Sequence, residues 1–192
     1  MEDASIANDL FAAGRGDEDA WRRLVGRFAG LVWAVARGYR LSDADAQDVS
    51  QTTWLRLAEH LDRIRDPERL GTWLATTAGR ESLRLLKRRR RELPVGEHED
   101  LEPVDAEVAR PEARLEARER SAALWQAFRS LSERCYRLLR LLLADPPPSY
   151  EEVGAALDMK IGSIGPTRAR CLADLREKMA LQGISGQPGG SS

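Results

Sequence analysis

The stretch that decides the fold is "LRLLKRRRRELPVGEHEDLEPVDAE", residues 83–107, in which a basic block runs directly into an acidic segment. The basic block ends in four consecutive arginines, Arg88–Arg91. Residues 92–112 hold eight acidic side chains against one basic side chain, Arg110, with three prolines and no apolar period. That composition is typical of a solvated linker. The change of sign therefore predicts two folded parts, one on each side of an acidic tether.

The composition on both sides of the tether favours helices. Leu, Ala, Arg and Glu dominate the 192 residues, aromatic residues make up 6%, and β-branched residues are sparse. No apolar run approaches the roughly 18 residues of a membrane span. The N-terminal "MEDASIANDL" also lacks the layout of a signal peptide. We expect an all-α, cytoplasmic protein with no membrane insertion.

Cysteine and histidine are too few to indicate a metal site. The chain has two histidines, His60 and His98, and no CxxC pair. Cys135 and Cys171 fall inside helical patterns far apart in sequence, which in a reducing compartment favours buried thiols over a disulfide. A Gly-rich phosphate loop and a nucleophile elbow are also missing from the sequence. We therefore predict no cofactor and no enzymatic activity.

The helical patterns and their punctuation divide the chain further. Ser42 is a candidate N-cap with Asp45 as its capping-box partner, and Asp66 with Pro67 is typical of another helix start. The C-terminal "QGISGQPGGSS" is typical of a disordered tail. The predicted organisation is a helical domain at 1–91, an acidic linker at 92–118, a second helical domain at 119–182 and a tail at 183–192.

Residues 72–91 form an amphipathic helix on a wheel of about 100° per residue. The predicted core face contains Leu74, Ala75, Ala78, Ser82, Leu85 and Leu86. The opposite side carries a stripe at spacings of four and three residues: Trp73, Thr77, Arg80, Arg84, Lys87 and Arg91.

This stripe is a candidate nucleic-acid surface. Only Glu81 offsets the seven basic residues between Arg80 and Arg91. A row of cations about 25 Å long can follow a phosphate backbone, and an aromatic side chain can stack on an unpaired base. The alternatives are a solvated charged face for the arginines and a core position for Trp73.

A helix-turn-helix pattern follows the three prolines at 146–148. Ser149 and Glu152 form a capping box before the short helix "YEEVGAAL", and the turn "DMKIG" leads to a longer helix. We expect Ser163 to cap that second helix and Pro166 to lie in its first turn. The predicted core residues are Val153, Ala156, Leu157, Ile161, Ile164, Leu172 and Leu175.

Together these segments resemble a bacterial sigma factor of the small, extracytoplasmic-function (ECF) type. "DADAQDVSQTTWLRLAEHLDRIR" and "GTWLATTAGRESLRLLKRRRR" are similar to region 2 of that family. "LSERCYRLLRLLLADPPPSYEEVGAALDMKIGSIGPTRARCLADLR" is similar to region 4. The resemblance implies two helical domains that bind core RNA polymerase and direct promoter recognition, DNA melting and transcription initiation.

The resemblance assigns roles to particular residues. It implies a polymerase-binding face on the third helix, where Leu55 is apolar and surrounded by polar residues: Asp45, Asp48, Gln51, Thr52, Leu55 and Glu59. It implies that region 2 contacts the downstream promoter element through Arg65, Arg69, Trp73, Thr77, Arg80, Arg84, Lys87, Arg88 and Arg91. In region 4 it implies DNA contacts by Lys160, Ser163, Thr167, Arg168 and Arg170. An ordinary solvated helix face is the alternative for the third helix.

The recognition helix departs from the family pattern. Gly165, Pro166 and Thr167 stand where relatives often carry basic residues and a serine. Glycine and proline have no side-chain hydrogen bonds to offer a base, so readout would rest more on Arg168, Arg170, backbone groups and DNA shape.

Other partners and other functions stay open at this point. An anti-sigma factor is a further partner that the family allows. A stand-alone helix-turn-helix regulator would account for both basic elements but not for the face around Asp48 and Gln51. An interaction protein that sequesters a helical partner is a third class. We also hypothesise that the acidic segment screens the basic block in the free protein.

Overall fold

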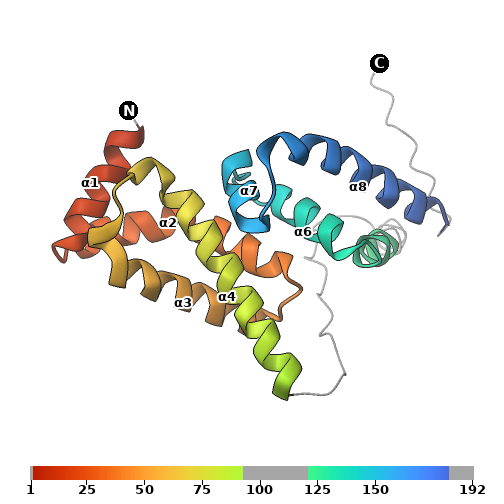
Figure 1. Cartoon of the computed structure of the whole chain (residues 1–192), viewed down its shortest axis with the longest axis horizontal. Helices are drawn as coiled ribbons and strands as arrows, with labels where there is room; N and C mark the ends of the chain where they lie inside the picture. The colour runs from red at the N-terminus through yellow and green to blue at the C-terminus, as the bar shows by residue number, and fades with distance from the viewer. Residues whose placement is uncertain (1, 93–120, 182–192) are drawn as a thin grey trace, which may run out of the picture.

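The computed structural model describes residues 2–92 and 121–181, and every regular element within those ranges is helical. The predicted acidic linker and the predicted tail fall outside the described residues. Residues 121–129 are helical as well. The elements, labelled in Figure 1, are α1 (Glu2–Gly14), α2 (Glu18–Gly38), α3 (Asp43–His60), the short 3-10 helices η1 (Leu61–Arg63) and η2 (Pro67–Arg69), α4 (Leu70–Glu92), α6 (Glu133–Leu142), α7 (Tyr150–Leu157) and α8 (Ile161–Leu181).

Side chains just before the helices satisfy free backbone N–H groups at the helix starts. Asp17 accepts hydrogen bonds from the N–H groups of Asp19 and Ala20 before α2, at 2.9 and 3.0 Å. The bond from Ala20 lowers the pKa of Asp17 below its ordinary value. Ser42 accepts from the N–H of Asp45, which confirms it as the N-cap of α3. Asp66 makes no such side-chain bond, although Pro67 does open η2.

Helix α4 is central to the N-terminal part, because it lies against both α2 and α3. Its predicted core face is confirmed, since five of the six residues are buried and Leu86 is half-buried. The buried five are Leu74, Ala75, Ala78, Ser82 and Leu85. The apolar face of α3 meets this core through Val49, Thr53 and Leu57.

The C-terminal part is built from residues 121–129, α6, α7 and α8. The hydroxyl of Ser132 caps α6, and Tyr136, Leu138 and Leu141 on that helix are fully buried. The expectation of two separate thiols is wrong: Cys135 on α6 and Cys171 on α8 form a disulfide. The sequence could not reveal this pairing, because the two cysteines meet only when α8 folds back over α6.

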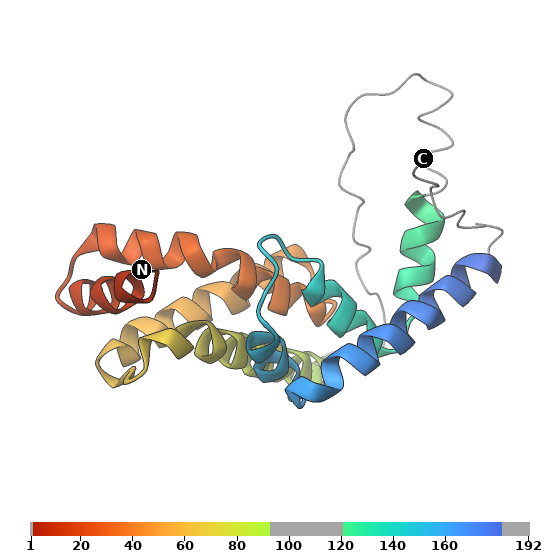
Figure 2. The same ribbon diagram turned by 90° about the horizontal axis from the view of Figure 1, so that it is seen from above.

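The two helical parts pack against each other and share one hydrophobic core. Helix α7 lies along α4, and α6 lies against α2. Seen from above, the C-terminal helices occupy one end of the molecule beside the N-terminal helices (Figure 2). None of the described helices is both long and apolar enough to cross a membrane.

Candidate nucleic-acid interface and docking face

The candidate docking face lies on the solvent side of α3. Leu55 is 65% exposed, whereas Val49, Thr53 and Leu57 on the opposite side of the helix are buried. Asp48, Gln51 and Glu59 are also exposed, and Thr52 is half-buried at the edge. The structure therefore brings an accessible apolar side chain together with carboxylate and amide groups, an arrangement suited to a partner with basic and apolar side chains.

Asp45 does not belong to that face, which corrects the sequence-based assignment. Its side chain is 5% exposed and accepts a hydrogen bond from the Ser42 hydroxyl at 3.0 Å. It also pairs with Arg89 on α4, with an Nη2 to Oδ1 distance of 2.6 Å. Asp45 thus joins the start of α3 to the basic end of α4, and its carboxylate is already engaged.

The basic stripe on α4 faces away from the core. Arg80, Arg84, Lys87, Arg88 and Arg91 are exposed. Arg84 pairs with Glu81 at 2.5 Å, and Glu81 also lies 3.6 Å from Arg56 on α3. Within the described residues no acidic side chain pairs with Arg80 or Lys87, so their charges are available to an anionic partner.

Trp73 and Thr77 lie at the less exposed end of the stripe. Trp73 is half-buried against the core, with its ring centroid 6.3 Å from that of His60. The Thr77 hydroxyl donates to the Trp73 carbonyl at 2.8 Å. Trp73 therefore packs partly against the core, and its contact with a base stays a prediction.

Arg65 and Arg69 extend the positive surface beyond the start of α4. Both are exposed in the segment that contains η1 and η2. Arg69 pairs with Asp66 at 3.2 Å within that segment. These two arginines lie before α4, and the basic residues of α4 itself begin at Arg80.

The helix-turn-helix of the C-terminal part follows the predicted start closely. Ser149 and Glu152 form both bonds of the capping box before α7, at 2.8 and 3.2 Å. The turn places Asp158 in the left-handed conformation. Gly154 allows this turn to close, because a Cβ there would lie only 2.8 Å from the Met159 carbonyl oxygen.

Helix α8 begins earlier than the sequence predicted. Its first residue is Ile161, so Pro166 lies inside the helix and Ser163 does not act as its cap. The Ser163 hydroxyl donates instead to the Lys160 carbonyl, at 2.7 Å. Ile161, expected in the core, is 49% exposed.

The predicted DNA contacts of α8 differ in their exposure. Thr167 shares the inner face with Ile164 and Cys171, and all three are buried. Its hydroxyl accepts a hydrogen bond from Arg170 at 3.3 Å, so Thr167 positions Arg170 and is not itself accessible to a base. Lys160, Arg168 and Arg170 are exposed, and Ser163 is half-buried.

Sequence reasoning missed the residues that join the two helical parts. The Tyr39 hydroxyl donates to the Ala156 carbonyl at 3.1 Å, and the Arg137 guanidinium lies 4.4 Å from the centre of the Tyr39 ring. Arg40 lies 4.0 Å from the centre of the Tyr136 ring and pairs with Glu133 at 2.9 Å. The dipeptide "YR" after α2 gave no signal of this role. The sequence of α4 did carry a weak signal of the contact: small residues form a row along one face, Gly71, Ala75, Gly79 and Ser82.

Comparison with known proteins shows what the chain is similar to. Residues 24–92 match the family model described as sigma-70 region 2. The chain is 31% identical over 170 residues to the ECF RNA polymerase sigma factor SigE of Mycolicibacterium smegmatis. That match covers 86% of this chain and 65% of the relative, so the chain spans slightly less than two thirds of the relative's length.

A solved structure of CnrH in complex with the cytosolic domain of CnrY has a similar fold, with a TM-score of 0.60. It covers 94% of this chain and 99% of that chain at 21% identity, which shows the fold alone. The region 2 match includes both stretches whose sequences resemble region 2, one on α3 and one on α4. Residues 24–92 thus correspond to sigma-70 region 2, and over 86% of its length the chain is similar to a sigma factor of the extracytoplasmic-function type.

Proposed function

We propose that this chain binds core RNA polymerase through the outer face of α3 and directs promoter recognition, DNA melting and transcription initiation. The observation that carries the proposal is the accessible Leu55 among Asp48, Gln51 and Glu59, inside the segment that matches region 2. An exposed leucine surrounded by polar groups is a compact anchor for a protein partner. The family is not one of enzymes, in agreement with the prediction that the chain catalyses no reaction.

In this proposal the basic surface of α4 contacts the downstream promoter element. Arg80, Lys87 and the arginines after it supply phosphate contacts, which raise affinity without reading sequence. Trp73, which is half-buried, offers the exposed part of its ring to a base that has left the stack. Extruding a base costs a few kcal/mol, which contacts with the unpaired strand must offset.

The C-terminal helix-turn-helix contacts the upstream element. Arg168 and Arg170 are exposed on the early turns of α8, where such motifs meet the major groove. The hydrogen bond to Thr167 fixes the direction of the Arg170 side chain. Because Gly165 and Pro166 offer no donor, the base readout in this proposal rests on the two arginines.

The same proposal includes an anti-sigma factor, a protein partner that holds the chain inactive. It also includes a cytoplasmic location. The supporting observation is the similar fold of CnrH, which was solved together with the cytosolic domain of CnrY.

The deciding experiment is co-elution with a bacterial core RNA polymerase on a sizing column. We expect the intact chain to co-elute and Asp48→Arg to lose the complex, since reversing the charge beside Leu55 opposes a basic partner. Glu177→Arg is the matched control, because Glu177 is exposed on α8, in the other helical part. If the folded chain does not co-elute, the sigma activity is refuted, and specific duplex binding by the chain alone would favour the stand-alone regulator.

A second experiment separates phosphate contacts from base contacts. Arg80→Ala and Lys87→Ala should each reduce the slope of log affinity against log salt by about 1, with equal effects on specific and random DNA. Arg168→Ala should weaken the specific promoter selectively. Equal losses on both DNAs for Arg168→Ala would contradict its proposed base contact.

A further inference from the structure

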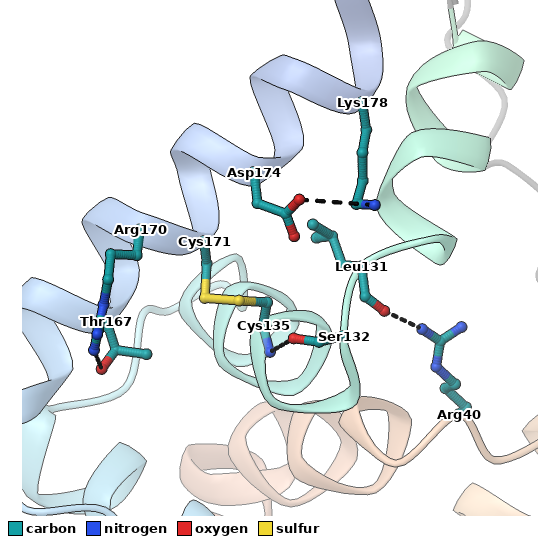
Figure 3. Close-up of a disulfide and its surroundings, with 9 residues drawn as sticks. All are labelled: Arg40, Leu131, Ser132, Cys135, Thr167, Arg170, Cys171, Asp174 and Lys178. Atoms are coloured by element: carbon teal, nitrogen blue, oxygen red, sulfur yellow. Dashed lines mark hydrogen bonds and ion pairs between the residues drawn. A yellow bond between two sulfur atoms is a disulfide. The ribbon is translucent and has the colours of Figure 1, made fainter. Parts of the chain in front are cut away.

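The disulfide between Cys135 and Cys171 lies in the part of the molecule that carries the helix-turn-helix. The two Cα atoms are 5.2 Å apart, and the bond closes a sequence separation of 36 residues (Figure 3). The Cys171 side chain is fully buried, whereas Cys135 is partly exposed at the start of α6. Cys135 is therefore the more accessible residue of the pair.

Helix α6 connects this bond to the N-terminal part of the molecule. Cys135 faces α8, while its neighbours Glu133, Tyr136 and Arg137 contact the end of α2. Arg40 also donates to the Leu131 carbonyl just before α6, at 3.3 Å (Figure 3). Helix α6 is thus held on one side by α2 and tied covalently on the other side to α8.

On α8 the bond lies next to the exposed arginines. Cys171 follows Thr167 by one turn on the same buried face, and Thr167 accepts the hydrogen bond from Arg170. Arg168 and Arg170 lie between these two buried residues in sequence. A constraint at Cys171 therefore acts on the turn of α8 that presents both arginines.

We propose that Cys135 and Cys171 form a redox-modification site that exchanges with small thiols and disulfides. In the reducing direction, a small thiolate attacks the more exposed Cys135 sulfur, and Cys171 leaves as a thiolate that takes up a proton. A second thiolate then attacks the outer sulfur of the mixed disulfide and releases the Cys135 thiol together with one small disulfide. Overall, the protein disulfide and two small thiols give two cysteine thiols and one small disulfide.

The surroundings suit an exchanging bond better than a permanent one. Cys135 is the third residue of α6, and the first turn of a helix favours the thiolate form. In a cytoplasmic compartment, which is part of the proposed function, disulfides are usually transient. The bond closes a loop with a sequence separation of 36 residues, so the presence or absence of this cross-link changes the stability of the C-terminal helices appreciably.

The oxidised form holds α8 against α6, and through α6 against the N-terminal part. The reduced form leaves α8 held by packing alone, so its amide hydrogens exchange faster. The site therefore sets how firmly Arg168 and Arg170 are presented, whichever partner they contact. This consequence does not require polymerase binding, so the inference and the proposed function fail independently.

The test uses the full chain equilibrated in glutathione buffers of different ratios of thiol to disulfide. Mass spectrometry after alkylation reports the fraction of disulfide, and hydrogen exchange reports the protection of residues 161–181. We expect a complete transition between the two forms, with exchange in α8 roughly tenfold faster after reduction. Residues 18–38 of α2 serve as an internal reference and should change less.

Two variants serve as controls for this experiment. Cys135→Ser places the hydroxyl at a partly exposed position and should exchange like the reduced chain in every buffer. Cys171→Ala avoids burying a polar group and should behave in the same way. Alkylation of both cysteines in the most oxidising buffer would overturn the proposal. Equal protection of α8 in the oxidised and reduced wild-type chain would overturn it as well.

Discussion

Asp45 and Asp48 lie one turn apart on α3 but have different surroundings. Asp45 is buried and bonded to Ser42 and Arg89, whereas Asp48 is exposed beside Leu55. We expect Asp45→Asn to lower the free energy of unfolding by about 1 to 3 kcal/mol, because Arg89 and Ser42 lose a charged acceptor. Asp48→Asn should change that free energy by less than about 0.5 kcal/mol. Urea unfolding followed by circular dichroism measures both, and equal effects would contradict the distinction.

Tyr39 gives the contact between the two helical parts a pH dependence. Burial raises the pKa of Tyr39 above its ordinary value of 10.0, with the nearby Arg137 acting in the opposite direction. Its contribution to stability is therefore complete below pH 10.0 and falls as the pH rises from there through the folded-state pKa, since the unfolded chain loses its proton first.

The prediction is that wild type loses more stability than Tyr39→Phe between about pH 9 and pH 11. At about pH 8 the free energy of unfolding of Tyr39→Phe should be about 1 kcal/mol lower than that of wild type, because the hydrogen bond to the Ala156 carbonyl is missing. Urea unfolding at each pH gives both numbers. Parallel pH profiles for the two proteins would show that Tyr39 does not titrate with unfolding.

At the scale of elements, two glycines in the helix-turn-helix should respond oppositely to the same change. A Cβ at Gly165 in α8 would meet no atom within 4 Å, so Gly165→Ala should raise the free energy of unfolding by about 1 kcal/mol. At Gly154 the Cβ would lie 2.8 Å from the Met159 carbonyl oxygen, so Gly154→Ala should lower it. Thermal unfolding of the pair measures both changes. A shift in the same direction would contradict the described turn.

The elements also show why sequence reasoning succeeded at some positions and failed at others. The capping box of Ser149 and Glu152 lies within four consecutive residues, so its geometry is local and readable. The start of α8 was misplaced because Ser163 and Pro166 are individually good start signals. The helix nevertheless begins at Ile161, before both of them. Local signals predict that a helix forms, but tertiary contacts decide which of its residues are buried in the core.

On the scale of the whole molecule, the sequence predicted the two helical parts and the basic stripe on α4, but it did not predict that the two parts pack against each other. The basic stripe on α4 could be predicted because its residues recur with the helical period of about 3.6 residues. The face that α7 covers was visible only as small residues, and no partner could be named from them. Arg40 reaches the carbonyl groups of Arg129 and Leu131 at 2.8 and 3.3 Å, contacts about 90 residues apart in sequence. A single chain without related sequences gives no signal for such a pair.

The contact between α4 and α7 can be opened by one substitution. A Cβ at Gly79 would lie 2.8 Å from the Ala156 carbonyl oxygen and 3.3 Å from the Tyr39 hydroxyl oxygen, both rigidly held. Gly79→Leu should therefore displace α7 from α4 at a cost of about 1 to 3 kcal/mol, while each helical part keeps its own helices.

Small-angle X-ray scattering should then show a larger radius of gyration for Gly79→Leu at unchanged helix content by circular dichroism. Gly26→Leu is the matched control, because Gly26 is exposed on α2 and its Cβ would meet no atom within 4 Å. An unchanged radius in folded Gly79→Leu would mean that the two parts are not held together through this face. An increase confined to Gly79→Leu would show that the packing of α7 on α4 holds the two helical parts together. That contact would then fix the position of the basic stripe on α4 relative to the arginines of α8.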